Sequence, residues 1–484
     1  MQPSFVLAII AVYFGVLVVI SYLTSRTSLV NSNSDFFVAN RQSPWYLVAF
    51  GMIGASLSGI TFISIPGTVE NSGFGYFQVV LGYTIGYAVI SLVLLPLYYK
   101  LNLTSIYTYL EQRFGRNAYV TGASFFVLSR LVGASFRLFL VANVLQLIVF
   151  DALGVPYYIT VSLTIILIWL YTFKSGIKTI VWTDTLQTFF MLLALVLAIV
   201  MLGDSLDLDH TNILAYLDAQ PNFKIFYFDD INSSNYFIKQ FVSGVFIAIV
   251  MTGLDQDMMQ KNLTCRNLKD AQKNVFWFTI VLTIVNFLFL FLGLLLFSYA
   301  KINGITAVGD ELFPEIAISG ELGFALALFF VVGLIAAAYS SADSALTSLT
   351  TSISVDLLQI QKRFTMKQQV VIRKRVHVLV AVILIGIMMI YKYAITDTSI
   401  INSLFEFAGY TYGPLLGLYS FGLFTRMKAR DLYIPYIAIL SPILTYMISL
   451  FLSYYFSFEL GFFVLIVNGL LSFLGLVLAS FKHD

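Results

Sequence analysis

The sequence predicts an all-α integral membrane protein with thirteen transmembrane helices. Of its 484 residues, 59% are apolar and only 11% are charged, whereas a soluble domain carries about a quarter charged residues. Uncharged runs recur at the length that a helix needs to cross a bilayer, about 20 residues. A soluble enzyme is excluded, and so is a porin, because porin strands alternate in segments of about ten residues.

The predicted spans follow from the hydrophobic runs between charge clusters. In chain order they cover 4–24, 45–66, 77–99, 118–149, 157–173, 182–202, 236–254, 275–300, 323–350, 376–394, 399–424, 432–453 and 460–480. The first run has no basic flank and no small-residue cleavage site, so we expect a retained helix and not a signal peptide. The longest loop, about 203–235, is too short for a further domain, so residues 1–484 are expected to form one transmembrane domain.

Charge sets the predicted orientation. Most of the 27 basic residues fall in alternate loops; those after the seventh run are Lys261, Arg266, Lys269 and Lys273. The intervening loops are acidic. By the positive-inside rule the N-terminus is outside and the C-terminus is cytoplasmic, in a multi-pass protein of the plasma (inner) membrane.

The second span contains glycines and serines around its middle, in Gly51–Gly67. If the helix unwinds near 56–59, it offers carbonyl oxygens to a cation and hydroxyls to a polar solute. The alternative is close helix packing through small residues.

The fourth span carries two arginines, Arg130 and Arg137, seven residues apart and therefore on roughly one helix face. Two buried guanidinium groups favour an anionic ligand or carboxylate partners, and Glu406 in the eleventh span is one candidate partner. Either arginine could instead extend to a membrane interface.

Two further spans carry carboxylates. Asp184 lies near the start of the sixth span, where it could simply favour the helix dipole. In the ninth span, Ser340, Asp343, Ser344 and Thr347 share one helical stripe. Hydroxyls with a carboxylate suit a hard cation such as Na⁺, although serines also bond back to carbonyls of their own helix. A carboxylate inside a span usually faces a cavity or a partner.

These motifs resemble the solute:sodium symporter family over essentially the whole chain. The resemblance rests on Tyr171, Thr172, Gly176, Val181–Asp184 and Gln187, on Asp255, Gln256, Asp257 and Gln260, and on Ala337, Ser340 and Ser341. It implies a five-plus-five inverted repeat with broken helices. The expected parts are an extra helix over 4–24, a first repeat over 45–202, an inverted repeat over 236–424 and two helices over 432–480.

The resemblance also implies ion sites. One Na⁺ site comprises the carbonyls of Gly54, Leu57 and Ala337 with the hydroxyls of Ser340 and Ser341. The segment 58–66 looks most like the sialic-acid transporter branch, which implies a second Na⁺ site at Asp184, Ser340, Asp343 and Ser344. That branch has a serine where this chain has Asp343, and its carboxylate-binding arginine aligns near Gly133.

The function expected is Na⁺-coupled symport of a small polar organic solute into the cell, with a sugar acid or other hydroxylated carboxylate favoured. The expected solute-binding residues are Ser56, Ser58, Thr61, Arg130 and Arg137. A neutral sugar, a polyol or an amino acid is the alternative solute, and a solute sensor that does not transport is the alternative class. No enzyme activity is expected, since the three histidines, His210, His377 and His483, lie in loops or near ends. The lipid bilayer is the expected partner, with no nucleic acid and no obligate protein.

Overall fold

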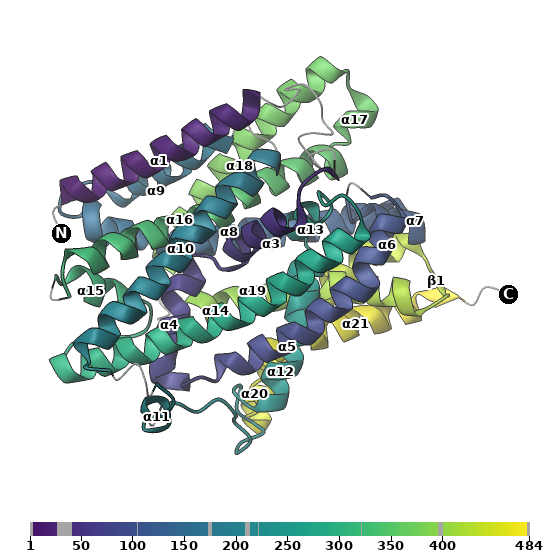
Figure 1. The fold of residues 1–484 in the computed structure, drawn as a ribbon. Coiled ribbons are helices and arrows are strands. Elements are labelled where there is room, and N and C mark those ends of the chain that lie inside the picture. Colours follow the sequence, from purple (N-terminus) through teal and green to yellow (C-terminus); the bar gives the residue numbers. More distant parts are fainter. Residues whose placement is uncertain are drawn as a thin grey trace.

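The computed structural model describes residues 3–26, 41–103, 105–172, 177–208, 213–220, 222–320, 322–394 and 400–481. Within them the chain is a bundle of helices that run roughly side by side (Figure 1). The described part has one small sheet, in which β1 (Lys428–Ala429) pairs antiparallel with β2 (Ser480–Phe481). The family motif residues Ser175 and Gly176 lie outside the described residues.

Helices occupy every interval in which a span is predicted. The first half holds α1 (Pro3–Arg26), α3 (Trp45–Ser56), α4 (Gly59–Ser72), α5 (Tyr76–Val89), α6 (Leu95–Lys100), α7 (Thr108–Arg113), α8 (Arg116–Leu145), α9 (Tyr157–Thr172), α10 (Ile177–Ser205) and α11 (Ile213–Asp218). The second half holds α12 (Phe237–Ala248), α13 (Gln256–Asn262), α14 (Leu268–Asn303), α15 (Leu312–Ile318), α16 (Phe324–Ser352), α17 (Ile360–Arg363), α18 (Met366–Ala394), α19 (Ile400–Phe424), α20 (Ile434–Phe456) and α21 (Val464–Leu478).

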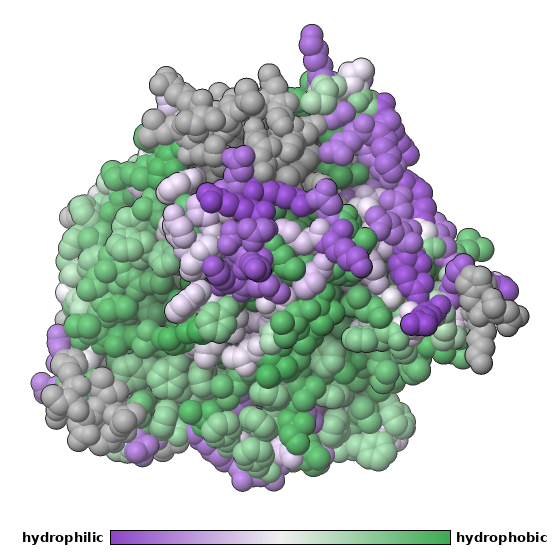
Figure 2. All heavy atoms as spheres, turned by 45° about the vertical axis from the view of Figure 1, so that its right-hand side comes forward, coloured by the Kyte–Doolittle hydropathy of each residue, from purple (hydrophilic) through white to green (hydrophobic). Residues whose placement is uncertain are grey.

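Eight of the helices in the described ranges are long and apolar enough to cross a membrane, and two bent pairs bring the number to ten. The fold class is confirmed as helical and membrane-embedded, whereas the count of thirteen spans stays a prediction. Large apolar side chains face outward on many helices, among them Leu92, Ile390 and Leu478. Figure 2, which brings the end carrying α7, α17 and β1 forward, shows hydrophilic side chains gathered over that end and hydrophobic ones around the flanks.

Two helices are broken where the chain carries glycine or a capping residue. Helices α3 and α4 meet at 57° across Leu57 and Ser58. Helix α12 continues through the π-helical turn Ile249–Gly253 and meets α13 at 70°. The side chain of Asp255 starts α13, because it accepts hydrogen bonds from the amides of Asp257 and Met258. Of the two alternatives that the sequence left open for the second span, the structure has the break near 56–59.

Three sequence-based expectations are corrected. Helix α10 begins at Ile177, so Asp184 lies two turns inside it and the helix-dipole explanation is wrong. The span prediction started later because hydropathy rises only near Val181. Lys261 belongs to buried α13 and not to a loop. His377 is buried inside α18, between the hydroxyls of Thr172 and Thr350.

Candidate transport site

The break between α3 and α4 faces helix α16 near the middle of the bundle. The hydroxyl of Ser341 on α16 donates a 3.3 Å hydrogen bond to the carbonyl of Ala55 on α3. A Cβ atom on Gly54 would lie 3.2 Å from the Ser340 hydroxyl oxygen on α16, a tight contact, and 2.1 Å from the Thr188 hydroxyl oxygen on α10, a steric conflict. Leu57 leaves the helical conformation, with φ −82° and ψ 85°. The break therefore holds hydroxyl and carbonyl oxygens beside one another.

The five residues expected at the first Na⁺ site lie on these two segments. Gly54 and Leu57 are at the end of α3 and its C-cap, and Ala337, Ser340 and Ser341 share one face of α16. All five are buried. Their donor atoms are neutral oxygens, which is the donor type that a hard monovalent cation takes.

Asp184 lies beside this segment but is engaged by a lysine. Nζ of Lys261 is 2.7 Å from Oδ2 of Asp184, and neither side chain is more than 1% exposed. The Ser340 hydroxyl donates a 2.8 Å hydrogen bond to Oδ1 of the same carboxylate. Asp343 and Ser344, also expected at a second Na⁺ site, are buried on α16, and Asp343 interacts electrostatically with Lys261.

Arg130 is neutralised from within the protein. Its guanidinium forms a salt bridge and hydrogen bond with Asp257, and Nη1 lies 3.9 Å from Oδ2 of Asp255. Both aspartates belong to the α12–α13 break. Glu406, the candidate partner named from the sequence, is exposed and lines a different cavity, so it is not the partner of Arg130. Arg130 is thus a structural link between α8 and α13.

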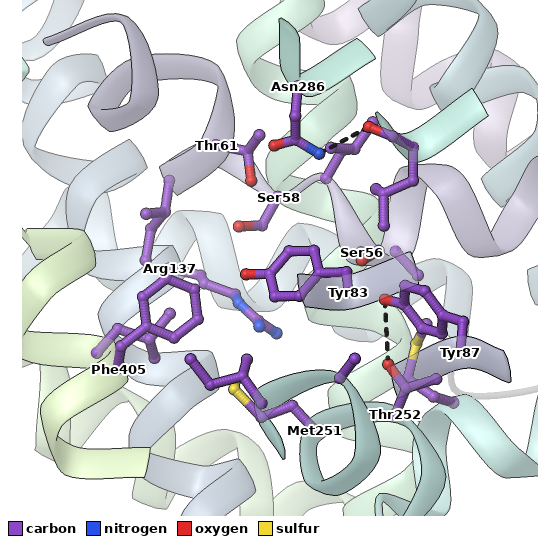
Figure 3. A pocket seen from close by; sticks show the side chains of 18 of the residues that line it. Ser56, Ser58, Thr61, Tyr83, Tyr87, Arg137, Met251, Thr252, Asn286 and Phe405 are labelled. Carbon is purple, nitrogen blue, oxygen red and sulfur yellow. Dashed lines mark hydrogen bonds between the residues drawn. The ribbon is translucent and has the colours of Figure 1, made fainter. Parts of the chain in front are cut away.

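Arg137 differs from Arg130 although the two share a helix face. The side chain is 9% exposed, and its Nε has no hydrogen-bond partner. In the part of the chain that the structure describes, no carboxylate forms a salt bridge with it. Figure 3 shows its guanidinium extending into a cavity between α4, α5, α8, α12 and α19. Burial of a guanidinium without an ion-pair partner is costly.

The cavity brings together all five residues expected to bind the solute. Ser56, Ser58, Thr61, Arg130 and Arg137 all line it. The cavity has a volume of about 70 Å³, smaller than the several hundred Å³ of an open ligand pocket, so a sugar-sized solute requires its walls to move apart. The rest of its wall was not expected from the sequence: it includes Tyr76 and, as Figure 3 shows, Tyr83, Tyr87, Thr252, Asn286 and Phe405. The wall therefore combines hydroxyl, amide and aromatic groups with two guanidinium groups, of which that of Arg130 is paired with Asp257.

A larger cavity lies next to this one and opens to solvent. It is lined by residues of loops predicted to be outside, such as Asp310 and Glu459, and by Tyr76, which lines the inner cavity as well. The Tyr76 hydroxyl lies 3.1 Å from that of Tyr83, and its ring stacks at 6.4 Å on Phe405. Tyr76 therefore stands between the two cavities.

The sequence held partial signals for the missed residues. Asp255 and Asp257 belong to the family motif, but the motif alone assigns them no role. Asp184 is a carboxylate inside a span, a position at which a cationic partner is expected. Lys261 was overlooked because the polar run Gln256–Asn262 looks like a loop. In the structure those side chains are buried in α13.

The sequence profile of the sodium:solute symporter family matches residues 36–430. The chain belongs to that family. It is accordingly a membrane protein that couples Na⁺ to the transport of a solute, and it is not an enzyme. The resemblance seen in the motifs is confirmed.

Individual relatives are distant but similar over their whole length. The sodium/sialic acid symporter NanT of Aliivibrio fischeri is 24% identical over 482 residues, which is 95% of this chain and 91% of NanT. SiaT of Proteus mirabilis, also a sodium/sialic acid symporter, is 23% identical over 86% of this chain and 84% of its own. A solved substrate-bound, outward-open Na⁺-coupled sialic acid symporter superposes with a TM-score of 0.82 at 19% identity, covering 99% of both chains. The fold is shared.

Proposed function

We propose that this protein imports a sugar acid or another hydroxylated carboxylate together with Na⁺, and that Arg137 binds the carboxylate. The observation that carries the proposal is the buried Arg137 guanidinium, which faces the cavity with no salt bridge to a described carboxylate. A solute carboxylate would supply the missing charge, and charge-assisted hydrogen bonds to a guanidinium are among the strong ones.

The hydroxyl groups of the cavity suit the remainder of such a solute. Ser56, Ser58 and Thr61 come from the α3–α4 break, and Thr252 comes from the π-helical turn that ends α12. Thr252 already contacts the Tyr87 hydroxyl at 3.5 Å. Two relatives, NanT and SiaT, are sialic acid symporters, which agrees with a sugar acid. The carboxylate-binding arginine of the sialic-acid transporter branch aligns near Gly133 of this chain. Arg137 lies one helical turn after Gly133.

The first Na⁺ site is proposed at the carbonyls of Gly54, Leu57 and Ala337 and the hydroxyls of Ser340 and Ser341. An ion there would bridge α3 to α16, and α3 continues directly into the solute-lining residues of the break. Na⁺ and solute would therefore favour the same arrangement of these helices, and each would increase the affinity for the other.

The same proposal includes the membrane topology and the inverted repeat. The bent pairs α3–α4 and α12–α13 are the first helices of the two proposed repeats, 45–202 and 236–424, so breaks occur at corresponding positions. Helix α1 begins at the opposite end of the bundle from β1, as Figure 1 shows, which agrees with an N-terminus outside and a C-terminus in the cytoplasm.

Solute binding can be tested by thermal stability of the purified protein in Na⁺ and in K⁺. We expect N-acetylneuraminate, glucuronate or a related sugar acid to raise the Tm in Na⁺, with little effect in K⁺, and neutral hexoses, polyols and amino acids to have little effect. The solute that stabilises should then accumulate in proteoliposomes along a Na⁺ gradient. Stabilisation by neutral sugars alone, equal in wild type and Arg137→Gln, would contradict the proposal. Binding without any uptake would indicate a sensor instead.

A further inference from the structure

We propose that the Lys261 ammonium group takes the place of a second Na⁺ at Asp184, so that the transporter works with one Na⁺ per cycle. This inference rests on the proposed Na⁺-coupled symport. It concerns the second ion site that the resemblance implies at Asp184, Ser340, Asp343 and Ser344. A free ion does not fit at Asp184 in this chain, because the Lys261 ammonium, a cation built into the protein, already occupies the Asp184 carboxylate.

The contact between Lys261 and Asp184 is direct. Nζ and Oδ2 are 2.7 Å apart, and the two side chains are at most 1% exposed. No space for an ion separates the two groups at this distance. A Na⁺ bound to the same carboxylate would stand next to the ammonium with little solvent to screen the repulsion between them.

The surroundings of Lys261 hold it in place. It extends from α13, whose start is fixed by the Asp255 cap, and Asp257 and Asp343 also interact with it electrostatically. The neighbouring Arg130 binds Asp257. Two cations of the protein itself, Lys261 and Arg130, therefore lie beside the carboxylates around α13. A tethered ammonium in such a setting supplies one positive charge that is neither taken up nor released.

The remaining oxygen of Asp184 connects this pair to the first Na⁺ site. Oδ1 accepts a 2.8 Å hydrogen bond from the Ser340 hydroxyl, which leaves the lone pairs of that hydroxyl available to an ion. Lys261 is thus a positioning residue: it holds Asp184, and Asp184 orients Ser340. For a monoanionic solute, one Na⁺ per cycle moves no net charge.

The number of bound ions tests the inference without any solute. Equilibrium binding of ²²Na⁺ to the purified protein, in choline chloride, should saturate at one ion per chain. In Lys261→Met, which removes the ammonium and keeps a long side chain, binding should rise to two ions, because the Asp184 carboxylate becomes available. The exposed Lys269→Met is the matched control and should stay at one. Two ions bound to the wild type, or one bound to a folded Lys261→Met, would overturn the inference.

A double variant keeps the test valid if Lys261→Met fails to fold around an unpaired Asp184. In Lys261→Met/Asp184→Asn both charges are removed together, and binding should remain at one ion, whereas complete loss of binding would show that Asp184 belongs to the single Na⁺ site. A wild-type protein that binds one Na⁺ but no sugar acid would contradict only the proposed solute. A protein that binds two Na⁺ and a sugar acid would contradict only this inference.

Electrical measurement gives a second readout that a merely structural lysine would not change. If the sugar acid carries one negative charge, uptake by wild-type proteoliposomes should be the same at zero and at inside-negative potential. Uptake by Lys261→Met should increase at inside-negative potential, because two Na⁺ would then enter with each monoanion. Potential-driven uptake in the wild type, with the same solute, would overturn the inference.

Discussion

The Tyr412 hydroxyl donates a 2.6 Å hydrogen bond to Oδ2 of Asp255, and so connects α19 to the break between α12 and α13. The other oxygen of Asp255, Oδ1, caps α13 by accepting hydrogen bonds of 2.9 and 3.2 Å from the backbone amides of Asp257 and Met258. One buried carboxylate therefore fixes the direction of α13 and the position of α19 together. Arg130, at 3.9 Å, adds helix α8 to this junction.

Tyr412→Phe should lower thermal stability. The change removes one hydrogen bond to a buried charged group without removing the ring, which costs about 1.5–3 kcal/mol. A decrease in Tm measured in detergent is the expected result, with Tyr454→Phe as the control because Tyr454 is 82% exposed. Equal Tm values for the two variants would show that the Tyr412–Asp255 bond contributes nothing to stability.

Arg137→Gln and Arg130→Gln should have opposite phenotypes although the two residues share a helix face. We expect Arg137→Gln to fold at least as well as the wild type and to lose binding of sugar acids, because it removes a buried charge that has no described ion-pair partner. Arg130→Gln should lose stability, by about 3–5 kcal/mol, because it leaves Asp257 and Asp255 without their cation. Measuring Tm and solute binding on both variants separates the solute-binding role of Arg137 from the structural role of Arg130. An Arg130→Gln variant as stable as the wild type would contradict the structural role.

Ser341→Ala should increase the Na⁺ concentration needed for half-maximal binding while leaving the protein folded. The change removes one of five proposed ligand oxygens, and a loss of about 1.4 kcal/mol corresponds to a tenfold weaker ion affinity. Ser348→Ala is the matched control, since Ser348 is buried on the same helix and donates its hydrogen bond to the carbonyl of Ala345 within that helix. Unchanged Na⁺ affinity in Ser341→Ala would exclude this hydroxyl from the site.

Cys265 should resist alkylation in the folded protein. Burial, with a smaller contribution from Asp270, raises the pKa of its thiol to about 12. At pH 8 the reactive thiolate is then about one part in ten thousand, and it increases roughly tenfold for each pH unit. Mass spectrometry after iodoacetamide treatment should find no label at pH 8 in the wild type and one label in Ser205→Cys, where the side chain is exposed. Full labelling of folded wild type would show that Cys265 is accessible.

Gly54→Ala should disturb the contact between α3 and α10. A Cβ atom there would lie 2.1 Å from the Thr188 hydroxyl oxygen, which is held by bonds to the carbonyls of Phe50 and Asp184. A steric conflict of this kind costs about 1–3 kcal/mol, and the expected results are a lower Tm and weaker Na⁺ binding. Gly386→Ala, whose Cβ would meet nothing within 4 Å, should behave as wild type.

Much of the fold followed from hydropathy and charge, because a membrane span has a fixed length and leaves a long uncharged run. The break at 56–59 was also predictable, since glycines and serines gathered inside an otherwise apolar helix. Helix ends were less predictable. Helix α18 starts at Met366, about ten residues before the predicted 376, because its first turns carry the basic residues that hydropathy assigns to a loop.

The residues of the candidate site could be predicted from the sequence, whereas the ion pairs that they form could not. Arg130 and Arg137 look equivalent along the sequence, and their difference arises because only Arg130 meets the carboxylates of α13, more than a hundred residues away. The Lys261–Asp184 pair spans 77 residues and joins two helices that no local pattern connects. The aromatic residues of the cavity, such as Tyr76 and Phe405, could not be separated from ordinary apolar positions of their helices.

A single ring, that of Tyr76, belongs to the walls of both the inner cavity and the larger cavity beside it. Side chains change rotamer in picoseconds to nanoseconds when free to move, whereas packed helices rearrange in microseconds to milliseconds. If the contacts of Tyr76 with Tyr83 and Phe405 open on the timescale of a free side chain, a solute exchanges many times across this ring before the helices move. The concentration that half-saturates uptake should then equal the dissociation constant of the outward-facing state, and competitors should act on binding before they act on the slow step.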